Sequence, residues 1–203
     1  MSQIKLLHSG GNGVSIVAPD SNPASDRTLK LPSDGDGTIL TTNSSVGKIL
    51  QVQQTHYSGR VSASIASGGE WAPSQLNTAI TPSATTSKVL ITAKVAVGSE
   101  IAGRMIFMSC YRGSTQIAQG DASGNNIIRM SSVAYLQHDN TVADIAFQFL
   151  DTPSTTSSTT YSFRFLHSQT ATMTLYINRP HNATDRVQDA YLSSNVTLQE
   201  VGA

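Results

Sequence analysis

Apolar residues alternate with polar residues along most of this chain, and no other feature constrains its fold as strongly. The clearest example is the run in which Tyr161, Phe163 and Phe165 are separated by single polar residues. Successive side chains of a β-strand face opposite sides of a sheet, so this alternation predicts a strand with one buried face. The same reasoning predicts strands at 49–54, 89–97, 104–111, 116–118, 127–136, 145–149, 173–177 and 196–199.

Helical periodicity is weak in comparison. No segment of about 11 or more residues repeats apolar residues at the spacing of a helix face, and residues 73–79 are predicted to form one short helical turn. We therefore predict an all-β protein in which residues 48–203 form an antiparallel, jelly-roll-like β-sandwich. Its core is expected to contain the alternating side chains Ile145, Phe147, Phe149, Tyr161, Phe163 and Phe165.

The first 47 residues differ from the rest because turn-forming residues interrupt them repeatedly. Runs such as 10–13 (GGNG) and 34–37 (DGDG) separate short extended pieces. No piece is long enough to bury a core by itself, and an isolated two-stranded hairpin is at best marginally stable in water. Residues 1–47 are therefore predicted to be an extended attachment arm. The apolar residues expected to make its contacts are Val14, Ile16, Leu29, Leu31 and Ile39.

The charge content is low and balanced, which argues against several classes of protein. Only 13% of the residues are charged, about half the share of an average domain, and 13 basic residues balance 13 acidic ones. No run of Lys and Arg offers a nucleic-acid surface. No apolar stretch approaches the ~20 residues that span a bilayer, and residues 1–13 lack the apolar segment of a secretory signal. We therefore expect no nucleic-acid partner, no membrane insertion and no secretion.

The residue types that carry most protein chemistry are few and scattered. Cys110 is the single cysteine, and its apolar neighbours predict an inert core thiol. The five histidines accompany no Gly-x-Ser-x-Gly motif, so we interpret them as surface or subunit-contact residues. A metal shared by His138 and Asp139 would require a turn, because adjacent strand residues face opposite sides. We predict that the protein is not an enzyme and has no catalytic residue, cofactor or metal.

Sugar cleavage by paired carboxylates is one chemistry that the sequence leaves open. The mechanism depends on the separation of two carboxyl groups, which a sequence does not give. The acidic residues that lie mostly in expected loops are Glu70, Glu100, Asp121, Asp139 and Asp144.

Three residues in expected loops are candidates for ligand recognition. Trp71 follows Gly68, Gly69 and Glu70 and could present its ring to a glycan. Asn126 and His138 lie in other expected loops, where binding functions concentrate. The competing interpretation is a tryptophan packed over an edge of the sandwich, with the other two residues in solvated turns.

A set of short motifs, in the same order along nearly the whole chain, resembles a family of viral structural proteins. The family consists of tailed-phage virion proteins of the tail-fibre and head-decoration type, notably from marine and cyanobacterial phages. The motifs are found at 13–20 (GVSIVAPD), 28–32 (TLKLP), 36–42 (DGTILTT), 47–52 (GKILQV), 80–83 (ITPS), 87–91 (SKVLI), 151–157 (DTPSTTS) and 194–201 (SNVTLQEV).

The resemblance implies a homotrimer with jelly-roll bodies and a non-enzymatic role on the virion surface, in a protein made in the host cytoplasm. Tail fibres of this type carry a longer attachment domain and a shaft, which these 203 residues do not contain. We therefore expect a capsid decoration or cement protein, on the head rather than the tail, whose arm binds the major capsid protein or another virion protein. The alternative is a short tail fibre or receptor-binding module that recognises a host surface glycan. A third reading is an enzyme acting on host polysaccharide.

Overall fold

The computed structural model describes residues 3–7, 9–11, 13–17, 48–121, 130–182 and 190–202. The chain divides into two units, Met1–Thr41 and Thr42–Ala203. In the first unit, β1 (Gln3–Leu7) and β2 (Gly13–Val17) form a two-stranded antiparallel sheet. Of the residues predicted to make arm contacts, Val14 and Ile16 belong to β2, whereas Leu29, Leu31 and Ile39 lie outside the described residues.

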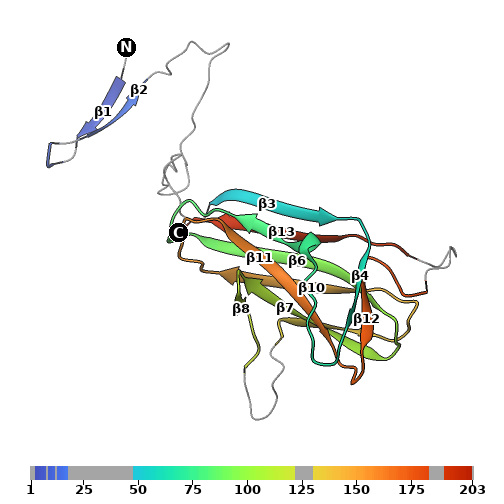
Figure 1. Cartoon of the computed structure of the whole chain (residues 1–203). Coiled ribbons are helices and arrows are strands. Elements are labelled where there is room, and N and C mark those ends of the chain that lie inside the picture. The colour runs from blue at the N-terminus through green and yellow to red at the C-terminus, as the bar shows by residue number, and fades with distance from the viewer. Residues whose placement is uncertain are drawn as a thin grey trace. The chain divides into compact units, whose positions relative to one another are not determined.

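The second unit, which we call the body, contains a six-stranded sheet built around β6 (Figure 1). One edge of β6 pairs with β10, and the other edge pairs with β13 and then with β12. The sheet is completed by β3, which pairs with β13, and by β4, which pairs with β12. Its antiparallel strands are β3 (Ile49–Tyr57), β4 (Val61–Ile65), β6 (Lys88–Ser99), β10 (Ala143–Asp151), β12 (Met173–Ile177) and β13 (Ser194–Val201).

A five-stranded sheet faces the first across the core. In it β11 lies between β5 and β7, and the second edge of β7 is shared by β8 and β9. Its strands are β5 (Thr78–Ile80), β7 (Arg104–Arg112), β8 (Thr115–Ile117), β9 (Ser132–Leu136) and β11 (Thr159–His167). The 3-10 helix η1 (Ser74–Leu76) precedes β5, as the sequence predicted.

The core lies between the inner faces of the two sheets and follows the predicted alternation. Large side chains with almost no exposed surface come from both sheets, among them Ile91, Ile106, Ile145, Tyr161, Phe163, Phe165, Leu175 and Leu198. Of the predicted core residues, Phe147 is also buried and Phe149 is half-buried against the same cluster. The prediction of an all-β antiparallel sandwich is therefore confirmed.

Two strands and one buried segment depart from the sequence prediction. The alternation in β4 is carried partly by Ala and Ser, and β5 has only three residues, so neither strand was predicted. Residues 95–99 of β6 are buried on both faces rather than on one. The chain at Arg179 covers the outer side there, and a Cβ at Gly98 would collide with the carbonyl oxygen of Arg179. Among the described residues, no helix is long and apolar enough to cross a membrane.

Candidate functional site

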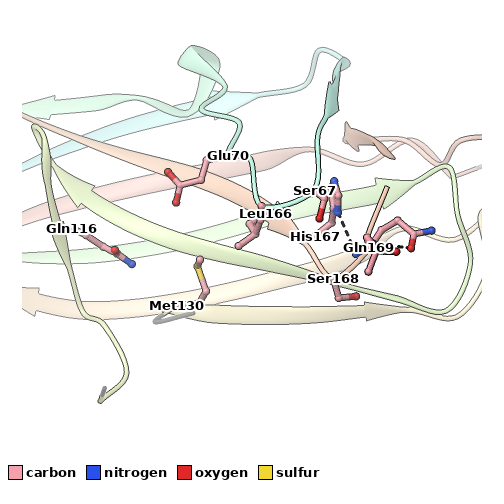
Figure 2. Close-up of a pocket in the computed structure, with 10 residues that line it drawn as sticks. Ser67, Glu70, Gln116, Met130, Leu166, His167, Ser168 and Gln169 are labelled. Atoms are coloured by element: carbon pink, nitrogen blue, oxygen red, sulfur yellow. Dashed lines mark hydrogen bonds between the residues drawn. The ribbon is translucent and has the colours of Figure 1, made fainter. Parts of the chain in front are cut away.

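A pocket of about 530 Å³ opens on the outer face of the five-stranded sheet. We call it the outer pocket. Leu166 forms part of its floor, because it alternates in β11 with the inward-facing Phe165 and His167. Figure 2 shows Glu70 and Met130 on either side of Leu166. The lining residues come from four separate stretches and are Ser67, Gly68, Glu70, Gln116, Met130, Leu166, His167, Ser168, Gln169 and Thr170.

The acidic wall of the outer pocket is held by a neighbouring arginine. One carboxylate oxygen of Glu70, Oε2, lies 3.1 Å from Nη1 of Arg164. The guanidinium of Arg164 also stacks on the ring of Tyr111, with Cζ 3.8 Å from the ring centroid. The guanidinium of Arg164 is therefore already engaged, and Oε1 of Glu70 remains as a hydrogen-bond acceptor.

His167 fixes the loop that forms the other wall. Its side chain is buried, and Nε2 lies 2.8 Å from the carbonyl oxygen of Ile65. Because that oxygen only accepts, Nε2 carries the proton, and Nδ1 in turn accepts the backbone N–H of Gln169 at 3.2 Å. The interpretation of all histidines as surface or subunit-contact residues is therefore wrong for His167. Its position continues the inward-facing series of β11, which outweighs its polarity.

Of the three residues predicted to bind a ligand, neither Trp71 nor His138 lines this pocket. Trp71 is half-buried beside Glu70, where it forms a β-bridge with Phe165 and packs against that ring at a centroid distance of 6.2 Å. His138 is exposed in a turn before β10, and its carbonyl oxygen accepts the hydroxyl of Thr141 at 2.7 Å. Asn126 lies outside the described residues.

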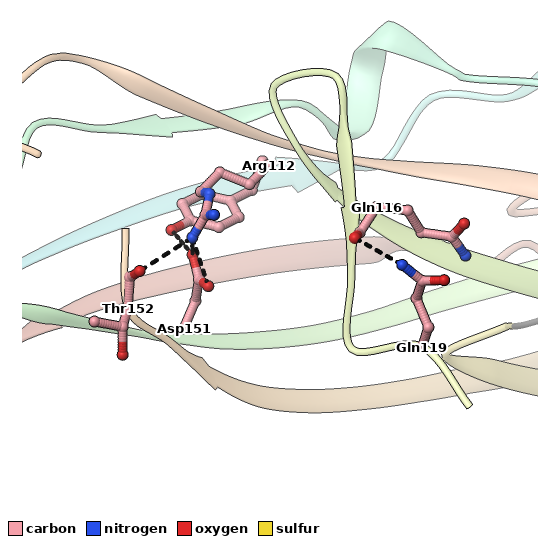
Figure 3. Close-up of polar contacts among 6 residues, drawn as sticks. Arg112, Gln116, Gln119, Asp151 and Thr152 are labelled. Carbon is pink, nitrogen blue, oxygen red and sulfur yellow. Dashed lines mark hydrogen bonds and ion pairs between the residues drawn. The ribbon is translucent and has the colours of Figure 1, made fainter. Parts of the chain in front are cut away.

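An ion pair between a buried carboxylate and a partly exposed guanidinium joins the two sheets at one end of the sandwich (Figure 3). Asp151, at the end of β10, accepts hydrogen bonds from Nη1 of Arg112 at 2.9 and 3.0 Å. The hydroxyl of Tyr161 donates to the same carboxylate at 2.6 Å. Burial, with the nearby charge of Asp151, raises the pKa of the Cys110 thiol to about 12, as expected for an inert core thiol. Burial and the bond to Asp151 also raise the pKa of Tyr161.

A second buried carboxylate, Glu200, lies in β13 and faces the core. It occupies the same cross-strand row as Asp151, because both residues pair with Val89 of β6. Glu200 accepts the backbone N–H and the hydroxyl of Ser83 at 2.7 and 2.6 Å, and the amide of Gln51 at 2.6 Å. Burial pushes the pKa of Glu200 up, but the hydrogen bonds from Gln51, Ser83 and Ser87 outweigh it and hold the pKa at about 2.

The low pKa of Glu200 predicts a specific loss of stability in acid. The folded-state pKa lies below the unfolded value, so the stabilisation is present above about pH 4.3 and is lost as the pH falls towards 2. Its size is roughly 2 kcal/mol, after discounting the pKa difference for solvent screening. Glu200→Gln removes the titrating group, so the free energy of unfolding of this variant should depend less on pH between 4.5 and 2. Urea denaturation across that range measures the difference, and parallel curves for the two proteins would contradict the assignment.

These two carboxylates are structural rather than catalytic in their arrangement. Each one is buried and bonded to protein groups, and neither lines the outer pocket. Within the described part of the chain, no group of three or more His, Cys, Asp or Glu residues could hold a metal ion.

Two apolar patches lie on the outer faces of the sandwich, one on each sheet. Patch 1 crosses the six-stranded sheet and consists of Val52, Leu90 and Leu150. Leu90 pairs directly with Leu150 on one side. On its other side Leu90 pairs with Gln199, which in turn pairs with Val52. Val52 is 52% exposed and Leu150 is 45% exposed.

Patch 2 lies on the five-stranded sheet and consists of Met105, Val133 and Tyr135. Met105 pairs with Tyr135, and Val133 pairs with the half-buried Phe107. The exposed fractions of the three patch residues are 47%, 53% and 60%. Isolated apolar residues are common on protein surfaces, but neighbouring ones of this size indicate interaction sites.

Comparison with known proteins gives matches among solved structures alone. No protein-family model and no curated protein matches the chain. A structure of infectious bursal disease virus, Gx strain, matches with a TM-score of 0.37 and 11% identity, over 94% of this chain and 48% of that chain. The crystal structure of the VP2 subviral particle of infectious bursal disease virus matches with a TM-score of 0.36 and 12% identity, over 86% and 42% of the two chains. The chain thus spans less than half the length of either structure.

Proposed function

We propose that this chain is a virion structural protein of a tailed phage, a homotrimeric decoration protein attached to the capsid by residues 1–47. The observation that carries the proposal is the pair of apolar patches on opposite sheets of the body. The division into a small two-stranded unit and a compact body, together with the sequence motifs quoted above, supports the same role.

Two different patches on one body suit a head-to-tail contact rather than a two-fold dimer, and we propose that the rotation between neighbours closes this contact into a ring. A two-fold interface uses the same patch on both subunits, whereas a ring joins two different patches, one from each neighbour. Patch 1 and patch 2 are different surfaces, and no charged side chain belongs to either. Three copies joined patch to patch would cover both apolar surfaces in every subunit.

The first unit has the properties of an attachment segment. Two strands alone are marginally stable in water, so β1 and β2 require another surface or chain for lasting order. Leu6 and Leu7 of β1 are 61% and 68% exposed, which leaves apolar side chains available for such a surface. Strand addition to a capsid protein would supply backbone partners as well.

The trimer is tested by charge substitutions in each patch. The full chain should sediment as a trimer of 21.5 kDa subunits at micromolar concentration. Val52→Glu in patch 1 and Tyr135→Glu in patch 2 should each weaken association at least about tenfold, because each buries an unpaired charge. Thr86→Glu, at an exposed loop position, is the matched control and should remain trimeric. A monomeric full chain, or an equal loss in the control, would contradict the proposal.

The virion role is tested on particles. Gold-labelled antibodies against the body should decorate the heads of intact virions of the phage that encodes the chain, and removal of residues 1–47 should abolish binding to undecorated heads. Label confined to the tail would favour the receptor-binding alternative, and unlabelled particles would refute the virion assignment.

A further inference from the structure

The outer pocket has the size and the polar groups of a small-molecule site, which no step of the structural role requires. Its volume of about 530 Å³ lies within the range of roughly 300–1,000 Å³ that is typical of ligand pockets. Leu166 and Met130 form an apolar floor, and hydroxyl, amide and carboxylate groups surround it.

Three polar groups at the pocket offer complementary hydrogen-bonding roles. The Ser168 hydroxyl accepts the backbone N–H of Met105 at 3.1 Å, so its own proton can be donated. The side-chain oxygen of Gln169 accepts the N–H of Thr170 at 3.0 Å, which leaves the NH₂ group as donor. Oε1 of Glu70 is an acceptor, because Oε2 bonds to Arg164.

Charge and shape exclude two other classes of ligand. None of the described lining residues is Lys or Arg, and the nearby Arg164 is already engaged by Glu70 and Tyr111, so an anion finds no free cationic partner. The apolar floor is short and is surrounded by polar groups, which does not suit a long aliphatic chain. A ligand with one apolar face and several hydroxyls matches the floor and the surrounding donors and acceptors.

We propose that the outer pocket binds a neutral saccharide unit, with its C–H face on Leu166 and Met130 and its hydroxyls bonded to Glu70, Ser168 and Gln169. This goes beyond the structural role and does not depend on the trimer. It places recognition at residues other than Trp71, Asn126 and His138.

The test uses the full chain and three neutral disaccharides, maltose, cellobiose and lactose, with isothermal titration and saturation-transfer NMR. At least one of them should bind with a dissociation constant near 1 mM, the range expected of a small polar ligand. Gln169→Ala should weaken that binding about tenfold, the effect of one hydrogen bond. Gln148→Ala removes an exposed amide from the outer face of the other sheet and is the matched control.

A second variant keeps the proposal falsifiable if Gln169→Ala disturbs its loop. Ser67 is exposed at the pocket, so Ser67→Trp should fold normally, fill the pocket and abolish binding. No binding of any disaccharide up to about 20 mM, binding that survives Ser67→Trp, or an equal loss in Gln148→Ala would each overturn the proposal. Octanoate should not bind, and saturable octanoate binding that Ser67→Trp abolishes would also overturn it.

Sedimentation of the same samples separates this inference from the structural one. A trimer that binds no saccharide leaves the assembly proposal standing and refutes the pocket ligand. A monomer that binds maltose would refute the trimer and leave the pocket ligand standing.

Discussion

Asp151→Ala is expected to lower the free energy of unfolding by about 3 kcal/mol, the low end of the cost of breaking a buried ion pair, because the partner Arg112 is itself partly exposed. Asp151 is 5% exposed, and it accepts bonds from both Arg112 and Tyr161 of the opposite sheet. Alanine removes the carboxylate that both groups bond, and leaves Arg112 only the carbonyl oxygen of Thr152, 3.1 Å from its Nη1. For a chain of this size the midpoint of thermal unfolding should fall by roughly 6–12 °C. Urea denaturation at fixed protein concentration measures the free energy directly.

A combined variant shows whether the loss comes from the unpaired charge or from lost packing. Replacing a whole buried ion pair by apolar residues is often neutral, so Arg112→Met, Asp151→Leu and Tyr161→Phe together should recover most of the stability. The mechanism is wrong if the triple variant is no more stable than Asp151→Ala. An effect below about 1 kcal/mol for Asp151→Ala would refute the structural role of the ion pair.

Asn178→Asp is expected to cost about 3 kcal/mol or more at pH 7, although the two side chains have nearly the same shape. Asn178 is fully buried, and its amide NH₂ donates to the carbonyl oxygens of Tyr57 and Gly59 at 2.8 Å each. Its amide oxygen accepts the hydroxyl of Ser194 at 2.6 Å. An aspartate would place a negative oxygen against two carbonyl oxygens at a position with no exposed surface.

The comparison of aspartate with asparagine isolates hydrogen bonding from backbone strain. The φ angle of Asn178 is +65°, a conformation that both residues tolerate better than most others. The loss should shrink at low pH, because the protonated acid regains one donor. Asn140→Asp, in an exposed turn, is the control and should change stability by less than about 0.5 kcal/mol. Equal losses in the two variants would contradict this account.

The alternation of apolar residues predicts most strands of the body, because a half-buried strand has a period that side-chain polarity reveals. The same two-residue period also indicates buried positions for residues whose polarity argues against burial. His167, Asp151 and Glu200 each continue the inward-facing series of their strands by one more step. Register alone would have placed all three in the core, against their usual preference for the surface.

What the sequence does not reveal is which distant groups make such burial tolerable. Arg112, which bonds Asp151, is 39 residues away from it in sequence, and Gln51, which bonds Glu200, is 149 residues away. The outer pocket is harder still to predict, because its walls come from four stretches that only the folded sheets bring together. The sequence predicted a binding role for Trp71, but its neighbour Glu70 is the residue that lines the pocket.

The place of β13 in its sheet has a consequence for how the protein is made. Among the described strands β13 is the last in sequence, yet it lies between β3 and β6, and β3 pairs with no other described strand. While the chain is being synthesised, β3 emerges from the ribosome long before its partner exists. The sheet can close only after β13 has also left the ribosome, through contacts far apart in sequence that form slowly. Until then β3 presents an unpaired edge to every other nascent chain nearby.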